Sequence, residues 1–283
     1  MPFVRDEDHD LFYTWAPAKG DLTLLFIHGL GSSSSFYAPV TSLLLEKGYS
    51  CLAFDTPGSG ISSLGGKTPT SATVAESALT LLSVLGRKPE HTIVVGHSMG
   101  ALVASELAQR INPLGVVLIG PVHPSPALAD IFDARIKTIE EQNGLEGLAN
   151  AIPDAATGSA STPTQRAFIR TLILSQTTKG YISLCRLIAG AQAPPYDQIK
   201  CPLLVIAGEE DKTSPLASCT HIKESWGCAE EKKKLEILPR VGHWHCIESP
   251  EGVAQALGSF VDGLHHHGYK QAADNSSSIR QLL

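Results

Sequence analysis

Short apolar segments alternate along most of the chain with segments that have a helical pattern. Each apolar segment is continuous rather than alternating, which is typical of strands covered on both faces of a parallel sheet. The expected strands are residues 22–28, 50–55, 92–96, 115–120, 202–208 and 234–240. Between the first three, apolar residues recur at helical spacing, at Phe36, Val40, Leu43 and Leu44 and at Val74, Ala78, Leu81, Leu82 and Leu85. This order predicts an α/β protein with a mostly parallel central sheet flanked by helices.

The regular alternation stops after residue 124. Residues 125–195 contain no convincing strand, only helical patterns at 127–142, 145–151, 165–176 and 179–190 and a loop at 153–164. An all-helical insertion between two strands is expected to cover the edge of the sheet as a cap. At the other end of the chain, residues 3–16 are expected to add an antiparallel hairpin to the sheet. The predicted organisation is a core of residues 1–124 and 196–268, a cap of residues 125–195 and a disordered tail of residues 269–283.

Composition narrows the class of protein. Apolar residues make up 43% of the chain and charged residues 18%, which is typical of a globular protein. The formal net charge is −6, and the cationic run Lys232–Lys234 follows directly on Glu230 and Glu231. A nucleic-acid partner is therefore not expected.

Targeting signals are not expected either. The first residues are acidic where a signal peptide has a cationic start and an apolar core. No apolar run approaches the roughly 20 residues that span a bilayer. The six cysteines include no Cys-x-x-Cys pair, and without an export signal free thiols are expected. We therefore expect a cytoplasmic monomer or homodimer that does not bind membranes.

The segment Gly96-His97-Ser98-Met99-Gly100 joins an expected strand to a segment rich in alanine and leucine. A serine at such a strand-to-helix turn is typical of a nucleophile elbow. Side chains at positions 96 and 100 would collide with the neighbouring strand and helix, so glycine is needed at both. The N-terminus of the following helix offers free N–H groups to a developing oxyanion. The alternative is a serine that merely caps the helix.

A serine hydroxyl is a poor nucleophile until a base takes its proton, so an acid and a histidine are expected to follow. In proteins with a nucleophile elbow they come in that order, at the ends of later strands. Strand 202–208 runs into Glu209-Glu210-Asp211. We favour Asp211, because with Pro215 it shapes a turn that aims a short carboxylate at the site. Glu210 is the alternative.

The base is expected after strand 234–240, in the segment Gly242-His243-Trp244-His245. We favour His243, because it follows a glycine straight after the strand and its ring can reach over the edge of the sheet. His245 is the alternative. A zinc site of His243, His245 and Cys246 is a further interpretation, but it lacks distant ligands with a known spacing.

Two backbone amides are expected to stabilise the oxyanion. One is Met99, directly after the serine, and the other is Leu30, in the loop His28-Gly29-Leu30-Gly31 after the first parallel strand. His28 and His97 are expected to support loops by hydrogen bonding. Asp55, in the segment 54–60, is expected to form turn structure rather than to take part in chemistry.

Taken together, these motifs resemble the α/β-hydrolase superfamily. The resemblance covers residues 20 to 265 and rests on Gly96 to Gly100, His28 to Gly31, Asp55 to Gly60, Asp211 with Pro215, and Gly242-His243 with Glu248-Ser249-Pro250. It implies an α/β-hydrolase fold, a catalytic triad of Ser98, Asp211 and His243 and a helical cap. Serine at position 98 argues against epoxide hydrolases and haloalkane dehalogenases, which have aspartate there. The cap stretch 180–185 with Ala189 is similar to that of 3-oxoadipate enol-lactonases, and strigolactone hydrolase-receptors have a similar four-helix cap.

An apolar cap over the serine predicts a small, largely uncharged acyl substrate. The candidates for contact with the substrate are His123, Phe132, Phe168, Tyr181, Cys185 and Trp244. Arg170 and Arg186 could meet an anionic group, or could simply be exposed. The expected function is hydrolysis of a small carboxylic ester, in particular a lactone, through an acyl-enzyme on Ser98, without a metal or cofactor. The alternatives are a hydrolase of carbon–carbon bonds in β-diketone-type substrates and a slow-turnover ligand receptor that retains the triad.

Overall fold

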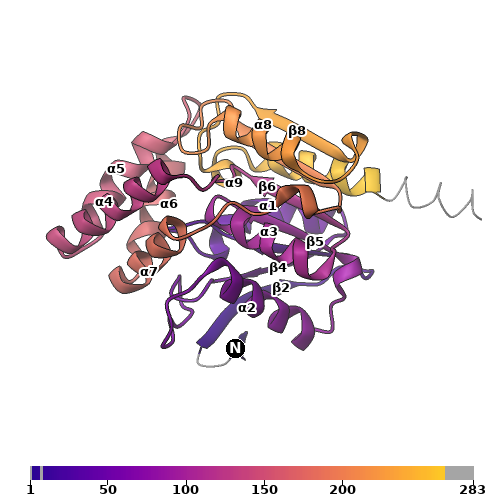
Figure 1. Cartoon of the computed structure of the whole chain (residues 1–283), viewed down its shortest axis with the longest axis horizontal. Coiled ribbons are helices and arrows are strands. Elements are labelled where there is room, and N and C mark those ends of the chain that lie inside the picture. The colour runs from indigo at the N-terminus through magenta and orange to yellow at the C-terminus, as the bar shows by residue number, and fades with distance from the viewer. Residues whose placement is uncertain (1, 7–8, 265–283) are drawn as a thin grey trace, which may run out of the picture.

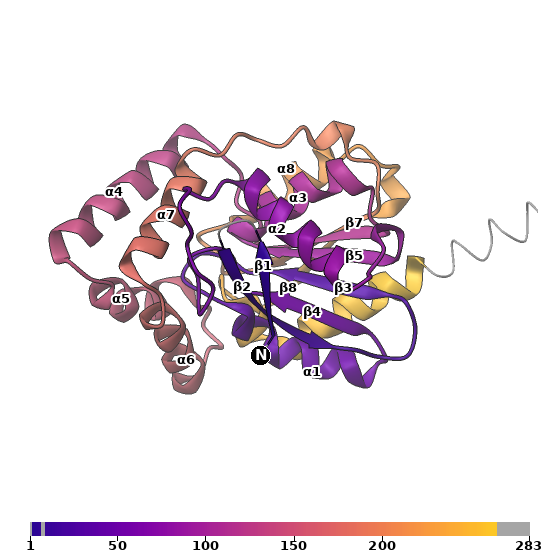
Figure 2. The same cartoon turned by 90° about the horizontal axis from the view of Figure 1, so that it is seen from below.

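The computed structural model describes residues 2–6 and 9–264 of the 283-residue chain. The predicted tail, residues 269–283, lies outside the described residues. Figure 1 shows a central sheet with helices on both faces and a group of four helices, α4 to α7, beyond one end of the sheet. In Figure 2, α2, α3 and α8 lie on one face of the sheet, and α1 and the helical residues 250–264 lie on the other.

The strands that the structure describes form one eight-stranded sheet in the order β1-β2-β4-β3-β5-β6-β7-β8. Their bounds are Phe3–Asp6 (β1), His9–Ala16 (β2), Thr23–Ile27 (β3), Ser50–Phe54 (β4), Thr92–His97 (β5), Gly115–Ile119 (β6), Leu203–Gly208 (β7) and Lys233–Leu238 (β8). The pairs β1–β2 and β2–β4 are antiparallel and the other pairs are parallel. The mostly parallel sheet and the N-terminal hairpin are confirmed.

Every residue of β3, β4, β5, β6 and β7 is buried, as expected of strands with helices on both faces. The covering helices are Ala38–Glu46 (α1), Ser71–Val84 (α2), Met99–Ile111 (α3) and Leu216–Ser225 (α8). The edge strand β8 differs from the prediction. None of the described strands lies on its outer side, and Ile237 in it is 43% exposed.

The sheet brings three distant loops to one edge. Because β5, β7 and β8 run parallel, their carboxyl ends lie at the same side of the molecule. Ser98 directly follows β5, Asp211 follows β7, and His243 follows β8. In open α/β sheets this edge is where ligands bind.

The insertion between β6 and β7 is helical, as predicted. It consists of Pro126–Gln142 (α4), Glu146–Ala156 (α5), Pro163–Leu174 (α6) and Thr178–Ala189 (α7). The sequence sets the starts of two of them: Ser125 accepts the Leu128 N–H before α4, and Thr162 and Gln165 form a capping box before α6. In space, α4 packs against α7 and α5 packs against α6.

One boundary in this insertion was predicted wrongly. Helix α5 runs to Ala156, so the first four residues of the predicted loop 153–164 are helical. Proline lacks an N–H and crowds the preceding turn, so it is disfavoured inside a helix. In the structure Ala149 and Pro153 are buried, and α5 packs against α6. Burial of this face outweighs the loss of one hydrogen bond.

Candidate active site

Ser98 joins β5 to α3 in a strained backbone conformation, with φ 52° and ψ −114°. A positive φ is uncommon in residues other than glycine and is found where the surroundings enforce it. A Cβ on Gly96 would overlap the backbone of Gly100, and a Cβ on Gly100 would overlap the carbonyl oxygen of Ile27. Both glycines are therefore required, as predicted. The capping alternative is wrong, because the Ser98 side chain makes no capping hydrogen bond to α3.

The structure joins Ser98, His243 and Asp211 in one chain of hydrogen bonds. His243 Nε2 lies 2.9 Å from Ser98 Oγ, and His243 Nδ1 lies 2.8 Å from Asp211 Oδ2. An ionised carboxylate can only accept, so Nδ1 carries the proton and Nε2 is free to accept from the serine hydroxyl. All three residues are buried, at 6%, 8% and 5% exposure.

The Asp211 carboxylate is held in its ionised form. Burial alone would raise its pKa, but the adjacent His243 and His245 and the Ser214 N–H outweigh burial and lower the pKa to about 2. Its other oxygen accepts the N–H groups of Thr213 at 2.8 Å and Ser214 at 2.9 Å, which fixes the direction of the side chain.

Glu210, the alternative acid, points elsewhere. Its carboxylate accepts the N–H and the hydroxyl of Ser159 in the loop between α5 and α6, and these bonds lower its pKa. No hydrogen bond within the described residues joins it to His243. The geometry thus favours Asp211 over Glu210 as the partner of the histidine.

His97 and His245 support His243 rather than replace it. His97 Nε2 and His245 Nδ1 donate to the carbonyl oxygen of His243 at 2.8 and 2.9 Å. Both rings are buried, and burial lowers both pKa values, that of His245 to about 4. They are therefore neutral rings at physiological pH that hold the backbone of His243.

The zinc interpretation finds no support in this arrangement. Both ring nitrogens of His243 are engaged by Ser98 and Asp211. Burial raises the pKa of the Cys246 thiol well above its usual range, which disfavours the thiolate that binds zinc. Within residues 2–6 and 9–264, no group of three or more His, Cys, Asp or Glu side chains is arranged to hold a metal ion.

The loop that carries Leu30 lies against Ser98. A Cβ on Gly29 would come within 2.9 Å of Ser98 Cβ and 2.8 Å of His97 Nδ1, so only glycine allows this approach. Met99 is the first residue of α3, and its N–H has no acceptor within the helix. In the described part of the chain, neither the Leu30 N–H nor the Met99 N–H donates to another protein group.

Two further predictions, about His28 and Asp55, are confirmed. His28 Nδ1 donates to the Gly29 carbonyl at 2.8 Å, and its Nε2 accepts the Thr56 N–H at 3.0 Å. Asp55 accepts the N–H groups of Ser34 and Ile61 at 2.7 and 3.0 Å, so it organises turns and does not reach Ser98.

The predicted contact residues are not all in one place. Phe132, Tyr181, Cys185 and Trp244 are buried and Phe168 is half-buried. Tyr181 reaches the loop of Leu30, since a Cβ on Gly31 would lie 3.1 Å from its ring. His123 instead lies near Tyr196 and His221 and lines a cavity of about 200 Å³ that Ser98 and His243 do not line.

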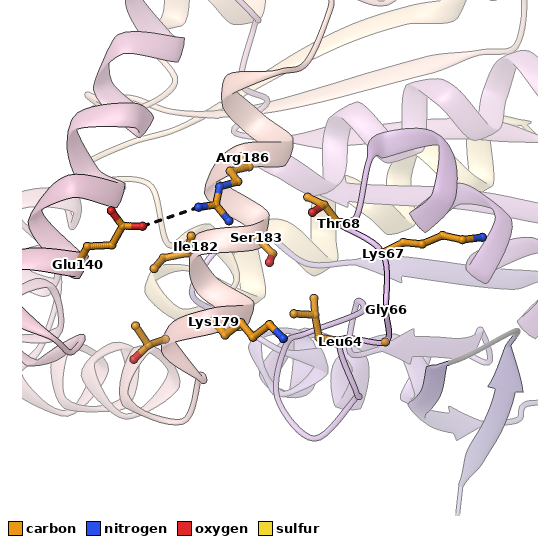
Figure 3. A pocket seen from close by; sticks show the side chains of 11 residues that line it. Leu64, Gly66, Lys67, Thr68, Glu140, Lys179, Ile182, Ser183 and Arg186 are labelled. Carbon is orange, nitrogen blue, oxygen red and sulfur yellow. Dashed lines mark ion pairs between the residues drawn. The ribbon is translucent and has the colours of Figure 1, made fainter.

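The two arginines suggested for an anionic group have other partners. Arg170 donates to Asn150 Oδ1 at 2.9 Å. Arg186 pairs with Glu140 at 3.7 Å and, with Lys179 of α7, lines a cavity of about 440 Å³ between α7 and residues 64–68 (Figure 3). Neither Ser98 nor His243 lines this cavity.

Sequence reasoning missed Arg135 of α4. Its guanidinium lies 4.8 Å from the centre of the Phe132 ring. It also lies close to the Tyr181 hydroxyl. Burial raises the pKa of Tyr181 to about 12, and the positive charge of Arg135 opposes this rise. Within the described residues it has no carboxylate partner. The spacing from Phe132 to Arg135 places both on one side of α4. That spacing was the available signal.

The comparisons agree with this fold. The order of strands, the Gly-x-Ser-x-Gly turn between β5 and α3 and the helical insertion are typical of an α/β hydrolase. Residues 24–256 match the model of the alpha/beta hydrolase family, so the chain belongs to that family and is a hydrolase. The resemblance found in the sequence is thereby confirmed. No helix among the described residues is both long and apolar enough to cross a bilayer.

The proteins that this chain is similar to are named for different substrates. The putative carbamate hydrolase RutD of Caulobacter sp. (strain K31) is 26% identical over 259 residues, which cover 87% of this chain and 93% of that protein. The 3-oxoadipate enol-lactonase 2 of Acinetobacter baylyi is 26% identical over 246 residues, 83% of this chain and 86% of that protein. The solved enol-lactonase of Burkholderia xenovorans LB400 has a TM-score of 0.80 at 23% identity and covers 92% of this chain and 100% of its own.

Proposed function

We propose that the protein is a serine hydrolase that cleaves small carboxylic esters, in particular lactones, through an acyl-enzyme on Ser98. The observation that carries the proposal is the hydrogen-bonded chain from Ser98 through His243 to Asp211, with distances of 2.9 and 2.8 Å. A buried, ionised Asp211 and a strained serine backbone are the arrangement that activates a hydroxyl at neutral pH.

In the first half of the reaction, His243 Nε2 takes the Ser98 proton while Oγ attacks the ester carbonyl. The carbonyl oxygen becomes an oxyanion and accepts hydrogen bonds from the Leu30 and Met99 amides. The tetrahedral intermediate then collapses, the carbon–oxygen bond to the leaving group breaks, and the leaving alkoxide takes the proton from Nε2.

In the second half, His243 removes a proton from water, and the resulting hydroxide attacks the acyl group on Ser98. Collapse of the second intermediate returns the proton to Ser98 and releases the acid. In a lactone the leaving oxygen stays attached to the acyl group, so a single hydroxy acid is released. Every step uses Ser98, His243, Asp211 and backbone amides, and we therefore expect no metal or cofactor to be needed.

We further propose that residues 125–195 act as a cap over a core of residues 1–124 and 196–268. The contacts that support this role lie on α7. The Tyr181 ring approaches Gly31 beside the oxyanion loop, and Gly180 packs directly on the backbone of Gly58. A cap seated on these loops would limit the size of the acyl group that reaches Ser98.

Two observations support a lactone as the substrate. The chain is similar to enol-lactonases, and α4 and α7 carry buried apolar residues. Because another relative is named as a putative carbamate hydrolase, a carbamate is the second candidate substrate, attacked at its carbonyl by the same serine.

Arg135 is a candidate binding residue for either kind of substrate. We propose that this cation of α4, which stands beside Tyr181, receives a carboxylate of the substrate.

A proton-release assay on lactones, enol lactones and aryl esters of graded acyl length, together with an ammonia-release assay on alkyl carbamates, tests the proposal. Fast acid release from a lactone by the wild type, reduced about 10⁴- to 10⁶-fold in Ser98→Ala, is the expected result. One slow turnover followed by stalling would instead indicate a ligand receptor. No acid from any ester or lactone and no ammonia from any carbamate would turn attention to carbon–carbon bonds of β-diketone-type substrates, whose cleavage yields two fragments.

A further inference from the structure

The backbone around His243 is fixed at three consecutive amides. The N–H groups of Gly242 and Trp244, which flank the histidine, both donate to the Glu248 carboxylate at 2.9 Å. The N–H of His243 itself donates to the carbonyl oxygen of Ala156 at 2.7 Å. Since the carbonyl oxygen of His243 accepts from His97 and His245, the peptide groups on both sides of the histidine are held.

The same carboxylate also reaches the helical insertion. Glu248 ends the short helix His245–Glu248 (α9), and its Oε2 atom accepts the N–H of Gly158 at 2.7 Å as well as that of Gly242. Gly158 and Ala156 lie at the end of α5, in the loop that leads to α6. One side chain therefore ties the loop of the proposed base to the loop of the proposed cap.

The two loops touch through their backbones. A Cβ on Gly242 would lie 2.5 Å from the Gly158 nitrogen and 2.6 Å from the Ala156 oxygen, and a Cβ on Gly158 would lie 2.7 Å from the Gly242 nitrogen. Such distances are too short for any side chain, so both positions need glycine. The close contact lets one half-buried carboxylate accept three backbone N–H groups at once.

We propose that Glu248 is a positioning residue for His243. By holding the amides on both sides of the histidine against the α5–α6 loop, it keeps the imidazole between Ser98 and Asp211. Movement of that loop would displace the base, so the position of the cap and the competence of the site are linked. This inference rests on the proposed nucleophilic role of Ser98.

Glutamine at position 248 is an informative substitution. A carboxylate accepts at both oxygens, whereas an amide accepts at one oxygen and donates at its nitrogen. In Glu248→Gln either the Trp244 N–H or the pair of Gly158 and Gly242 N–H groups would face another donor. The side chain keeps its size, so the packing is otherwise preserved.

Glu210→Gln is the matched control. The Glu210 side chain binds the same α5–α6 loop, through the N–H and hydroxyl of Ser159, but within the described residues it accepts no hydrogen bond from the amides that flank His243. If anchoring the loop were all that mattered, both variants would behave alike.

Two measurements on the full chain test the inference. The first is the rate at which a fluorophosphonate labels Ser98, a step in which Oγ bonds to phosphorus, fluoride leaves and His243 takes the proton. The second is the far-downfield proton NMR signal of the His243 Nδ1–H that is donated to Asp211. We expect Glu248→Gln to label about 100-fold more slowly and to lose or broaden the signal, because a small displacement of the base is costly. Glu210→Gln should match the wild type in both.

A wild-type labelling rate and an unchanged NMR signal in Glu248→Gln would overturn the inference. An equal loss in Glu210→Gln would do the same. If Glu248→Gln does not fold, Glu248→Asp, which keeps the charge but has a shorter reach, replaces it with the same expectations, and thermal unfolding establishes that it is folded. If the wild type is not labelled but shows an NMR signal that Glu248→Gln loses, the proposed function fails while the positioning role stands.

Discussion

The Asp211 carboxylate lies 2.8 Å from the Nδ1 atom of His243, and both groups are almost fully buried. The pair sets the tautomer of the imidazole, because an ionised carboxylate requires the proton to be on Nδ1. The opposite nitrogen is then an acceptor, and it lies 2.9 Å from the Ser98 hydroxyl. In the proposed mechanism, this relationship between Asp211 and His243 directs the histidine to act as the base for Ser98.

Replacing Asp211 by asparagine should abolish most of the activity without unfolding the protein. The amide can hold the ring in place in the wrong tautomer, with its proton on Nε2, and kcat should fall about 10⁴-fold. Steady-state kinetics on the most active ester of the substrate series would measure the change. Glu210→Gln serves as the control and should keep wild-type kcat. Equal losses in the two variants would contradict the assignment of the acid.

The buried histidines should make the protein sensitive to mild acid. The pKa of His245 is lowered by burial from 6.5 to about 4, so the unfolded chain binds the proton more tightly than the folded one. The stability from this group is fully present above about pH 6.5 and is lost as the pH falls toward 4. The shift corresponds to about 3 kcal/mol. Urea unfolding at a series of pH values would measure this loss.

The variant His245→Asn separates the contribution of His245 from that of other groups. Between pH 6.5 and 4, its free energy of unfolding should decrease less steeply than that of the wild type. Below about pH 4, the wild type should continue to lose stability, because Asp211, with a pKa of about 2 in the folded state, then takes up its proton more readily in the unfolded chain. Identical slopes between pH 6.5 and 4 would show that His245 titrates normally.

Arg135 should discriminate among substrates. If it binds a carboxylate, Arg135→Gln should raise KM about tenfold for esters that carry an acid group and leave KM for neutral esters unchanged, since a hydrogen bond to a charged group contributes about 1.5 kcal/mol or more. Arg186→Gln is the matched control, because Arg186 pairs with Glu140 and lines the separate cavity of Figure 3. An equal effect of Arg135→Gln on neutral and acidic esters would contradict the assigned role.

Much of the fold could be predicted from the sequence because its signals are local. Continuous apolar runs mark strands buried on both faces, and the glycines around Ser98 mark a turn that excludes side chains. The parallel sheet then brings the carboxyl ends of β5, β7 and β8 together, and with them Ser98, Asp211 and His243. The end of α5 was missed because the burial of Pro153 depends on a partner helix that the local pattern does not reveal.

The parts of the site that depend on contacts between distant segments could not be predicted. Glu248 entered the sequence reasoning only as part of a motif, because one of its three donors, Gly158, lies 90 residues away from it in the chain. The choice between Asp211 and Glu210 could be argued from the turn, but only the structure shows Glu210 bound to Ser159. His123 was suggested as a residue at the border of the pocket, and its ring lies next to Tyr196 and His221.

Covalent labelling tests the central proposal most directly. The wild type and Ser98→Ala would be treated with a fluorophosphonate, and the mass of the intact protein and of its peptides would be measured. The proposed mechanism predicts a single adduct on the peptide that contains Ser98, complete in the wild type and absent in Ser98→Ala. No adduct on the folded wild type, or an adduct of the same mass that persists in Ser98→Ala, would contradict the role of Ser98 as the nucleophile.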